Sequence, residues 1–293
     1  KLLMECLSAI SRQTFKPTTV YICDNRSTDG TKDYLKSNGY FNTIVNSINY
    51  KYLEMPINGG GAMGFSIGMK TAYNDGADAF WMMDDDGLPD TKALETLIPY
   101  LEKYNFVAPI VLGRTNRDKL CGPVKGSYDP NILLDIYHNK VMKGYVNPFN
   151  GGLFSRKLVK EVGFPKEELF IYGDELNYKE RCEDKGYICY GIFDAKHYHP
   201  DFIVNDHERW GKMVRFIKKP LSMYCQNRNI VYNTKRRFRK QPLKSLAKLL
   251  YMPIEYNLFI LLKHPSCKWF KIINKAYFDG IFNRWGGQYK YMK

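Results

Sequence analysis

Apolar and polar positions along the first two thirds of the chain predict strands that alternate with helices. Residues 1–13 have a helical pattern, and residues 19–23 form a β-rich run. The pattern then predicts a helix over 31–38, a strand over 51–55, a helix after the glycine-rich turn 58–64 that runs to about residue 74, and a strand over 79–83. This alternation is typical of a mostly parallel sheet with crossover helices, so the predicted fold class is α/β.

The last part of the chain has a different pattern. We predict a catalytic domain over 1–234 and a basic, amphipathic helical extension over 235–293. Within the extension, apolar residues recur at helical spacing over 249–262, but Pro253 and Glu255 interrupt them. A run this short is not expected to span the ~30 Å of a bilayer core. Two alternatives stay open: a helix that lies on a membrane surface, and a helical hairpin that faces a protein core.

Composition excludes a disordered chain, since 44% of the residues are hydrophobic and 25% are charged. The seven cysteines form no CxxC pair, and no signal peptide is recognised, so we expect reduced thiols and a cytoplasmic location. The net charge of +14 is concentrated in one segment. Its basic residues are Lys235, Arg236, Arg237, Arg239, Lys240, Lys244 and Lys248. Such a cluster favours an anionic partner: a phosphate-bearing substrate, a membrane surface or a nucleic acid. No nucleic-acid-binding motif is visible, so no nucleic acid is expected.

Three aspartates, Asp84, Asp85 and Asp86, directly follow the predicted strand over 79–83. Adjacent carboxylates repel one another, and a divalent cation would compensate for that repulsion in a cleft; a solvated acidic turn is the alternative. Asp24-Asn25 and the glycine-rich turn also follow predicted strands. Because ligands of open α/β sheets lie beyond the carboxyl ends of the strands, the three loops together predict one cleft for a phosphorylated ligand and a metal.

These residues, in this order, resemble the inverting family 2 glycosyltransferases with the GT-A fold, and the resemblance covers about residues 1–235. Asp24 and Asn25 resemble the family's nucleotide-binding loop, and Asn58-Gly59 resembles its glycine-containing segment near the sugar nucleotide. Asp84-Asp85-Asp86 resembles the DxD signature that holds a metal on the donor diphosphate. The resemblance implies a Rossmann-like sheet with flanking helices, and it implies that the family's first strand is missing ahead of residue 1.

The resemblance also implies individual roles at the metal. Asp84 and Asp86 would be ligands, and Asp85 would contact the donor. Oxygen ligands suit Mg²⁺ or Mn²⁺, and an added imidazole favours Mn²⁺. In galactofuranosyltransferase-like members a histidine completes the metal shell, and His199 matches it here, with His197 as the fallback.

A second group of acids, Asp174 and Glu175, opens a predicted helix. Acids are favoured in the first turn of a helix, which is the alternative explanation for them. The resemblance assigns the catalytic base to Glu175, with Asp174 left open as the alternative, while Asn177 departs from the acid that is usual at its position. It places Gly151, Gly152 and Tyr172 on the acceptor side, although a β-bulge would explain the two glycines equally well.

The function implied is transfer of a hexose, best matched by galactofuranose from UDP-galactofuranose, to a hydroxyl of a cell-surface or lipid-linked glycan. The reaction would be a metal-assisted single displacement at the inner face of the cell membrane, where the basic extension would make peripheral contact with anionic lipid. A rhamnosyltransferase that uses dTDP-rhamnose is the alternative within this class. Outside it, a metal-dependent nucleotidyltransferase or hydrolase, or a non-catalytic adaptor, stays open.

Overall fold

The computed structural model describes residues 1–145, 148–201, 207–211 and 214–292. The chain forms two compact units. The first comprises Lys1–Pro165 and Tyr178–Phe202, and the second comprises Lys166–Asn177 and Ile203–Lys293. The predicted boundary after residue 234 does not coincide with this division. That residues 1–234 contain the catalytic residues stays a prediction.

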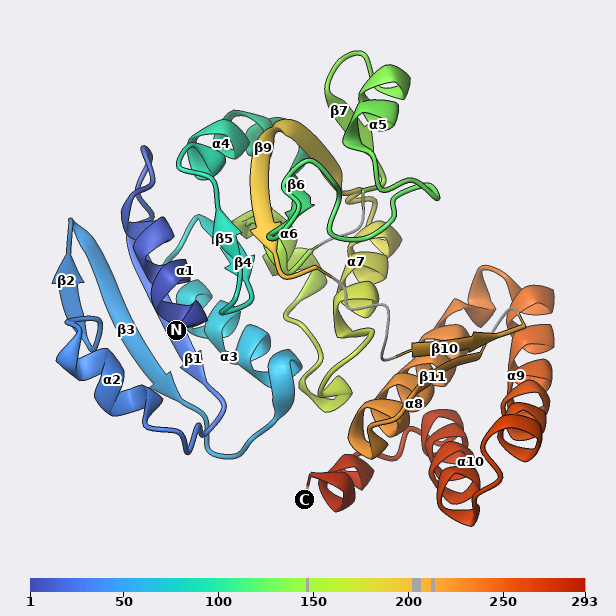
Figure 1. Cartoon of the computed structure of the whole chain (residues 1–293). Coiled ribbons are helices and arrows are strands. Elements are labelled where there is room, and N and C mark those ends of the chain that lie inside the picture. The colour runs from blue at the N-terminus through green and yellow to red at the C-terminus, as the bar shows by residue number, and fades with distance from the viewer. Residues whose placement is uncertain (146–147, 202–206, 212–213, 293) are drawn as a thin grey trace. The chain divides into compact units, whose positions relative to one another are not determined.

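The first unit contains most of the strands of the described chain (Figure 1). Its helices are α1 (Leu2–Ser11), α2 (Thr31–Ser37), α3 (Gly60–Asn74), α4 (Ala93–Tyr104), α5 (Pro130–Ile136) and α6 (Arg156–Val162). Its strands are β1 (Thr19–Asp24), β2 (Thr43–Val45), β3 (Ile48–Glu54), β4 (Ala79–Met83), β5 (Leu88–Pro89), β6 (Phe106–Gly113), β7 (Val141–Lys143), β8 (Asn150–Ser155) and β9 (Tyr190–His199). Helix α7 (Asp174–Asp184) begins in the second unit and ends in the first.

The strands of the first unit form two sheets. One has the order β1-β3-β2, in which β1 and β3 are parallel. The other has the order β4-β8-β6-β9-β5, with β7 beside β9. Among the described residues, β1 pairs with β3 alone and β4 pairs with β8 alone. The expectation of a missing first strand stays a prediction.

The predicted α/β class is confirmed, but the larger sheet is mixed rather than mostly parallel. Strands β6 and β9 are parallel, whereas β8 runs antiparallel to both β4 and β6. The reason lies in the connections. The chain reaches β8 from β6 through α5 and β7 rather than through one crossover helix, and strand direction follows from that path, which local hydrophobicity does not encode.

The ends of the helices and strands agree with the sequence prediction more closely than the direction of strand pairing does. The strand predicted over 79–83 is β4, and the strand predicted over 19–23 is β1, which ends at Asp24. The helices predicted over 1–13 and 31–38 are α1 and α2, each slightly shorter than predicted. Helix α3 begins at Gly60, inside the glycine-rich turn.

Strand β6 forms the centre of the first unit, because all its residues are buried. Phe106 stacks on Phe154 of β8 with ring centroids 4.4 Å apart, and Phe154 meets Tyr178 of α7 edge to face at 5.5 Å. A strand buried on both faces is fixed by packing. Its last residue, Gly113, pairs with His199 at the end of β9, so this packing also fixes the position of His199.

The second unit is mainly helical. Its further elements are η1 (Glu167–Leu169), β10 (His207–Trp210), β11 (Val214–Ile217), α8 (Pro220–Arg236), η3 (Arg237–Arg239), α9 (Pro242–Lys263), α10 (Cys267–Ile281) and η4 (Gly287–Tyr291). Helix α8 lies within its core, where Tyr224 is fully buried, and Tyr256 and Phe259 of α9 bury their rings in the same cluster. The second unit therefore has a hydrophobic core of its own.

Helix α9 corrects the expectation drawn from residues 249–262. It has 22 residues rather than 14 or so, and it is the one helix of the described chain that is long and apolar enough to cross a membrane. Pro253 lies inside it without ending it. A third of its most apolar window is buried against protein, which is also usual for a core helix of a soluble domain.

Candidate functional site

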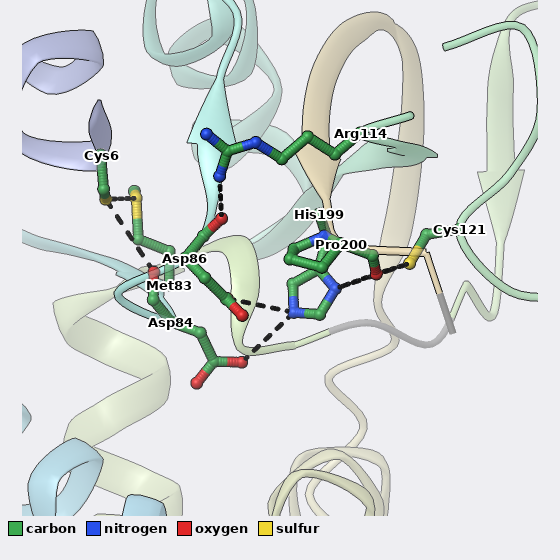
Figure 2. A network of polar contacts seen from close by, with 8 residues as sticks. All are labelled: Cys6, Met83, Asp84, Asp86, Arg114, Cys121, His199 and Pro200. Carbon is green, nitrogen blue, oxygen red and sulfur yellow. Dashed lines mark hydrogen bonds and ion pairs between the residues drawn. The ribbon is translucent and has the colours of Figure 1, made fainter. Parts of the chain in front are cut away.

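The aspartates Asp84 and Asp86 meet His199 at one edge of the larger sheet. The first two follow β4, and His199 ends β9. One donor atom from each of the three lies within 4.8 Å of the others. His199 Nε2 is 3.3 Å from Asp86 Oδ1 and 4.0 Å from Asp84 Oδ2, and Figure 2 shows the three side chains pointing toward one another. The sequence prediction named the same three residues.

His199 is held in one orientation by its other ring nitrogen. Nδ1 lies 2.9 Å from the Pro200 carbonyl oxygen and 3.5 Å from Cys121 Sγ (Figure 2). Since a carbonyl only accepts, Nδ1 carries a proton, and Nε2 faces the carboxylates. Burial disfavours a charged ring, but the hydrogen bonds to Asp86 and Cys121 and the charge of Asp86 raise the His199 pKa to about 10. The same hydrogen bond lowers the Asp86 pKa against the effect of burial.

This group fits a divalent cation. Two carboxylates and an Nε2 aimed at them supply two hard oxygen donors and one imidazole, a set that suits Mn²⁺ and accommodates Mg²⁺. The side chain of Asp84 is 44% exposed and that of Asp86 is 29% exposed, so a ligand can reach them from solvent. Asp85 is exposed and lies outside the group.

Arg114 supports the aspartate loop, a role that sequence reasoning missed. It follows β6, and its guanidinium donates to the Asp86 carbonyl at 3.3 Å (Figure 2). It also pairs with Glu5 of α1. The Cys6 thiol lies 3.9 Å from the Asp84 carbonyl. No local motif marks Arg114, because its place depends on the pairing of β6 with β9.

His197, the fallback ligand, lies beneath the loop instead of in the metal group. It is fully buried, and burial followed by the charge of His199 lowers its pKa to about 3. A Cβ on Gly87 would lie 2.6 Å from its Nε2, and one on Gly151 would lie 3.1 Å from its Nδ1. The neutral ring is therefore packed between two glycine backbones.

Gly151 and Gly152, predicted on the acceptor side, are buried in β8. Gly151 has a φ of 82°, and a Cβ on Gly152 would lie 2.1 Å from the Pro148 carbonyl oxygen. The register of β4 against β8 shifts at Met82/Met83, beside these glycines. The bulge that the sequence left open is thus present and accounts for both glycines through packing; contact with an acceptor stays a prediction.

Asp24 ends β1 with its carboxylate already bonded. One oxygen accepts the Ser27 N–H at 2.8 Å, and the other accepts the Tyr52 hydroxyl. Burial opposes the charge, but these hydrogen bonds lower the Asp24 pKa. The neighbouring Asn25 packs on α3, where a Cβ on Gly64 would lie 3.3 Å from Asn25 Nδ2. Asp24 therefore shapes the loop, and its predicted nucleotide contact is not tested by this geometry.

Asn58 and Gly59 lie at the start of α3. Asn58 Oδ1 accepts the Gly60 N–H at 3.1 Å, which satisfies one of the free donors of the first turn. A Cβ on Gly59 would lie 2.4 Å from Met63 Sδ. Both residues thus have structural roles in this turn, and donor binding by them stays a prediction.

The predicted base residues belong to the second unit. Asp174 and Glu175 begin α7, and Asp174 is 6% exposed. Glu175 is partly buried, and its Oε2 accepts the Gly173 N–H at 3.0 Å. Tyr172, predicted on the acceptor side, donates its hydroxyl to Ser222 Oγ at 3.3 Å. The two acids therefore lie in the first turn of a helix, where acids are generally favoured. This position does not test whether either of them acts as the catalytic base.

The structure explains why residue 177 is an asparagine rather than the acid that is usual at its position. It is fully buried, and its Nδ2 donates to Asn233 Oδ1 at 2.8 Å. A carboxylate would place two acceptor oxygens against each other in a buried site.

Comparison with known proteins gives one family match and several relatives. Residues 1–163 match glycosyl transferase family 2. The galactofuranosyltransferase GlfT1 of Mycobacterium tuberculosis (strain H37Rv) is 33% identical over 156 residues, which are 51% of each chain. GlfT1 of Mycolicibacterium smegmatis is 29% identical over 210 residues, which are 68% of this chain and 67% of the relative. The chain thus spans about half the length of the Mycobacterium tuberculosis relatives.

Solved structures share the fold. S. aureus TarS 1-349 superposes with a TM-score of 0.57 at 15% identity, covering 97% of this chain and 78% of TarS. The same protein in complex with UDP-GlcNAc gives a TM-score of 0.56 at 15% identity, covering 95% of this chain and 77% of TarS. At this identity the likeness concerns the fold alone.

Proposed function

The chain belongs to glycosyl transferase family 2, and from that membership and its GT-A fold we propose that it transfers a hexose from a nucleoside diphosphate sugar to a hydroxyl group, with inversion. One observation carries the proposal: Asp84, Asp86 and His199 converge at the edge of the sheet as a ligand set for Mn²⁺ or Mg²⁺. A bound cation supplies positive charge to the departing diphosphate.

The donor we propose is UDP-galactofuranose. The relatives in two mycobacterial species are named galactofuranosyltransferases, and a solved structure with the same fold holds UDP-GlcNAc. Asp85, Asn25 and Asn58 would contact this donor. The acceptor would be a glycan or lipid-linked glycan of the cell envelope.

In the proposed reaction the acceptor oxygen attacks the anomeric carbon on the face opposite the leaving group. The new carbon–oxygen bond forms as the bond to the diphosphate breaks, and Glu175 takes the acceptor proton. The uridine diphosphate leaves with the bonding electron pair. Asp174 is the second candidate for the base, because it shares the first turn of α7.

A panel of nucleotide sugars tests the donor. UDP-galactofuranose with Mn²⁺ should raise the melting temperature of the full chain and should support sugar transfer; dTDP-rhamnose is the competing donor. Stabilisation by every nucleoside diphosphate together with hydrolysis or nucleotidyl transfer, and without sugar transfer, would favour the other enzyme class. No Mn²⁺-dependent stabilisation by any of them would contradict both.

We also propose that the second unit contacts an anionic membrane at the inner face of the cell. One face of α9 supports this: Leu243, Leu250, Ile254 and Leu261 are 81%, 61%, 64% and 68% exposed and recur at helical spacing. The opposite face of α9 is buried in the protein core. An apolar stripe with no protein cover in the described chain is the pattern of a helix that lies in a membrane interface.

Charge favours an anionic lipid surface as the partner. Between residues 209 and 292 the acids are Glu255 and Asp279, and they are only 4% and 2% exposed. The exposed charged residues of the terminal helices are therefore basic. They include Arg239, Lys240, Lys244, Lys263, Lys268 and Lys271. Each basic residue near an anionic bilayer contributes about 1 kcal/mol of attraction, and the aliphatic stripe suits acyl chains better than stacked bases.

Vesicle flotation tests this contact. The chain should float with vesicles that contain phosphatidylglycerol and should float less with pure phosphatidylcholine. The pair Leu250→Gln and Ile254→Gln should abolish flotation, whereas Ile44→Gln should not, although Ile44 is 72% exposed in the first unit. If the Leu250→Gln and Ile254→Gln pair floated as well as Ile44→Gln, the proposed membrane contact through α9 would be contradicted. Resistance to alkaline carbonate extraction from cells would contradict peripheral binding and favour a spanning helix.

A further inference from the structure

The segment before α7 has an unusual backbone. Phe170, Tyr172 and Gly173 have φ values of 67°, 65° and 85°. For a residue with a side chain the left-handed region costs about 1–3 kcal/mol and persists only where the surroundings impose it. Two such residues, Phe170 and Tyr172, lie within four positions of Asp174, so the segment is held in place by contacts from elsewhere in the second unit.

Asn229 of α8 supplies most of these contacts. It is fully buried, and its Nδ2 donates to the carbonyl oxygens of Leu169 at 2.7 Å, Ile171 at 3.0 Å and Tyr172 at 2.8 Å. An amide nitrogen has two protons, so three carbonyls share them. One side chain thereby fixes the direction of three carbonyls within four residues of the chain.

Arg228, the preceding residue, binds the same segment from the side of η1. Its Nη2 lies 2.9 Å from the carbonyl oxygens of both Glu168 and Leu169, and its Nη1 donates to Gln288 Oε1 at 2.6 Å. Its Nε donates to Asn229 Oδ1 at 3.0 Å, which orients the amide. Because Arg228 is fully buried, loss of these bonds would leave an uncompensated charge.

Asn233, one turn later on α8, completes the set. Its Nδ2 donates to the Gly173 carbonyl at 3.0 Å, and its Oδ1 accepts from Asn177 in the first part of α7. A Cβ on Gly173 would lie 3.4 Å from Asn233 Nδ2, so the contact is close. Gly173 in turn donates its N–H to Glu175.

We infer that Arg228, Asn229 and Asn233 are positioning residues that set the direction of the Glu175 carboxylate through the backbone of residues 168–173. The inference rests on the proposed role of Glu175 as base. The proposed function gives Arg228 and Asn229 no role, and this inference supplies one. A network that served the fold alone would affect stability and leave the chemical step unchanged.

The variant Asn229→Ala tests this inference, with Asn227→Ala as the matched control. Asn227 lies on the same helix and is equally buried, but its Nδ2 donates to Met223 of that helix. Asn229→Ala should lower kcat about 100-fold, the effect of a reacting group displaced by about 1 Å. The KM for the donor and the Mn²⁺-dependent stabilisation by UDP should stay as in the control.

Combination with Glu175→Gln separates positioning from stability. If Asn229 acts through Glu175, the double variant should be no more than about twofold slower than Glu175→Gln alone, because the same contribution cannot be lost twice. Multiplication of the two losses would overturn the inference, as would full activity of Asn229→Ala.

Hydrogen exchange gives a readout that does not depend on sugar transfer. Amides of residues 168–177 should exchange faster in Asn229→Ala than in Asn227→Ala, and equal exchange would overturn the inference. If the wild-type chain transfers no sugar, the proposed function fails while this measurement still decides whether the segment is held by α8. If Asn229→Ala does not fold, Asn233→Ala serves the same tests, since it removes the contact with Gly173.

Discussion

The two units hold their candidate site residues in opposite ways. Asp84 and Asp86 meet His199 with side chains partly open to solvent, and a cation would complete the group. In the second unit Asp174 is buried next to Gly173, whose carbonyl accepts from Asn233, and Asn233 in turn accepts from the buried Asn177. The first arrangement is completed by a ligand, whereas the second is complete within the protein.

The difference teaches how each site is built. The metal group depends on strand pairing between distant segments, because β5, which follows the aspartates, pairs with β9 through Leu88 and Tyr198 and so brings the end of β9 to the loop after β4. The segment before α7 depends on one helix, α8. Substitutions in the first site should change metal and nucleotide binding, while those in the second should change the chemical step.

Glu175→Gln should produce the largest effect. Removal of a general base costs about 10²- to 10⁴-fold, so kcat should fall by about 10³-fold in a transfer assay. Mn²⁺-dependent stabilisation by UDP should be unchanged, because the metal group lies in the first unit. If Asp174→Asn shows this loss and Glu175→Gln keeps near-full activity, Asp174 is the base.

Asp86→Asn should have the next largest effect. Unlike Glu175→Gln, it should weaken the Mn²⁺-dependent binding of UDP. Removal of a carboxylate that stabilises charge in the transition state costs about 10²- to 10³-fold. Calorimetry should show loss of Mn²⁺-dependent UDP binding, while Asp85→Asn, with a side chain outside the group, should retain the metal. Retention of Mn²⁺ affinity in Asp86→Asn would contradict the ligand assignment.

His199→Asp should give a smaller, qualitative change. An all-oxygen ligand set suits Mg²⁺ better than a set with an imidazole. Activity with Mg²⁺ relative to Mn²⁺ should therefore rise, by about tenfold if the ligand contributes as strongly as typical partners of a metal site. An unchanged ratio would show that His199 does not bind the cation.

Tyr52→Phe should have the smallest effect. It removes the hydroxyl that bonds Asp24, so the free energy of unfolding should fall by about 1 kcal/mol. Tyr50 of the same strand is the matched control, since its buried hydroxyl has no hydrogen-bond partner among the described residues. Tyr50→Phe should cost nothing in a urea titration; an equal loss for both would argue against the Asp24 bond.

Sequence predicts the local elements of the first unit well, because β1 and β4 are bounded by turn residues and charges. It does not predict strand direction in the larger sheet, which depends on connections of more than thirty residues between β6 and β8. It locates Asp84 and Asp86 through their cluster, and it locates His199 through resemblance, since a lone histidine carries no local signal.

Other parts of the site could not be predicted. The contact of Arg114 with the aspartate loop exists because β6 and β9 end side by side. The amide at Asn177 looks like an isolated departure in the sequence, and its reason becomes visible when Asn233 lies against it. Such partners are brought together by tertiary structure and leave no spacing pattern in the chain.

The outward stripe of α9 has a practical consequence for the purified protein. In detergent-free buffer its leucines are exposed to water, and two copies can shield them by pairing stripe to stripe. Elution volume should therefore depend on protein concentration and on added amphiphile. An apparent dimer in such a buffer would result from shielding of the apolar stripe from water and would not report how the protein assembles in the cell.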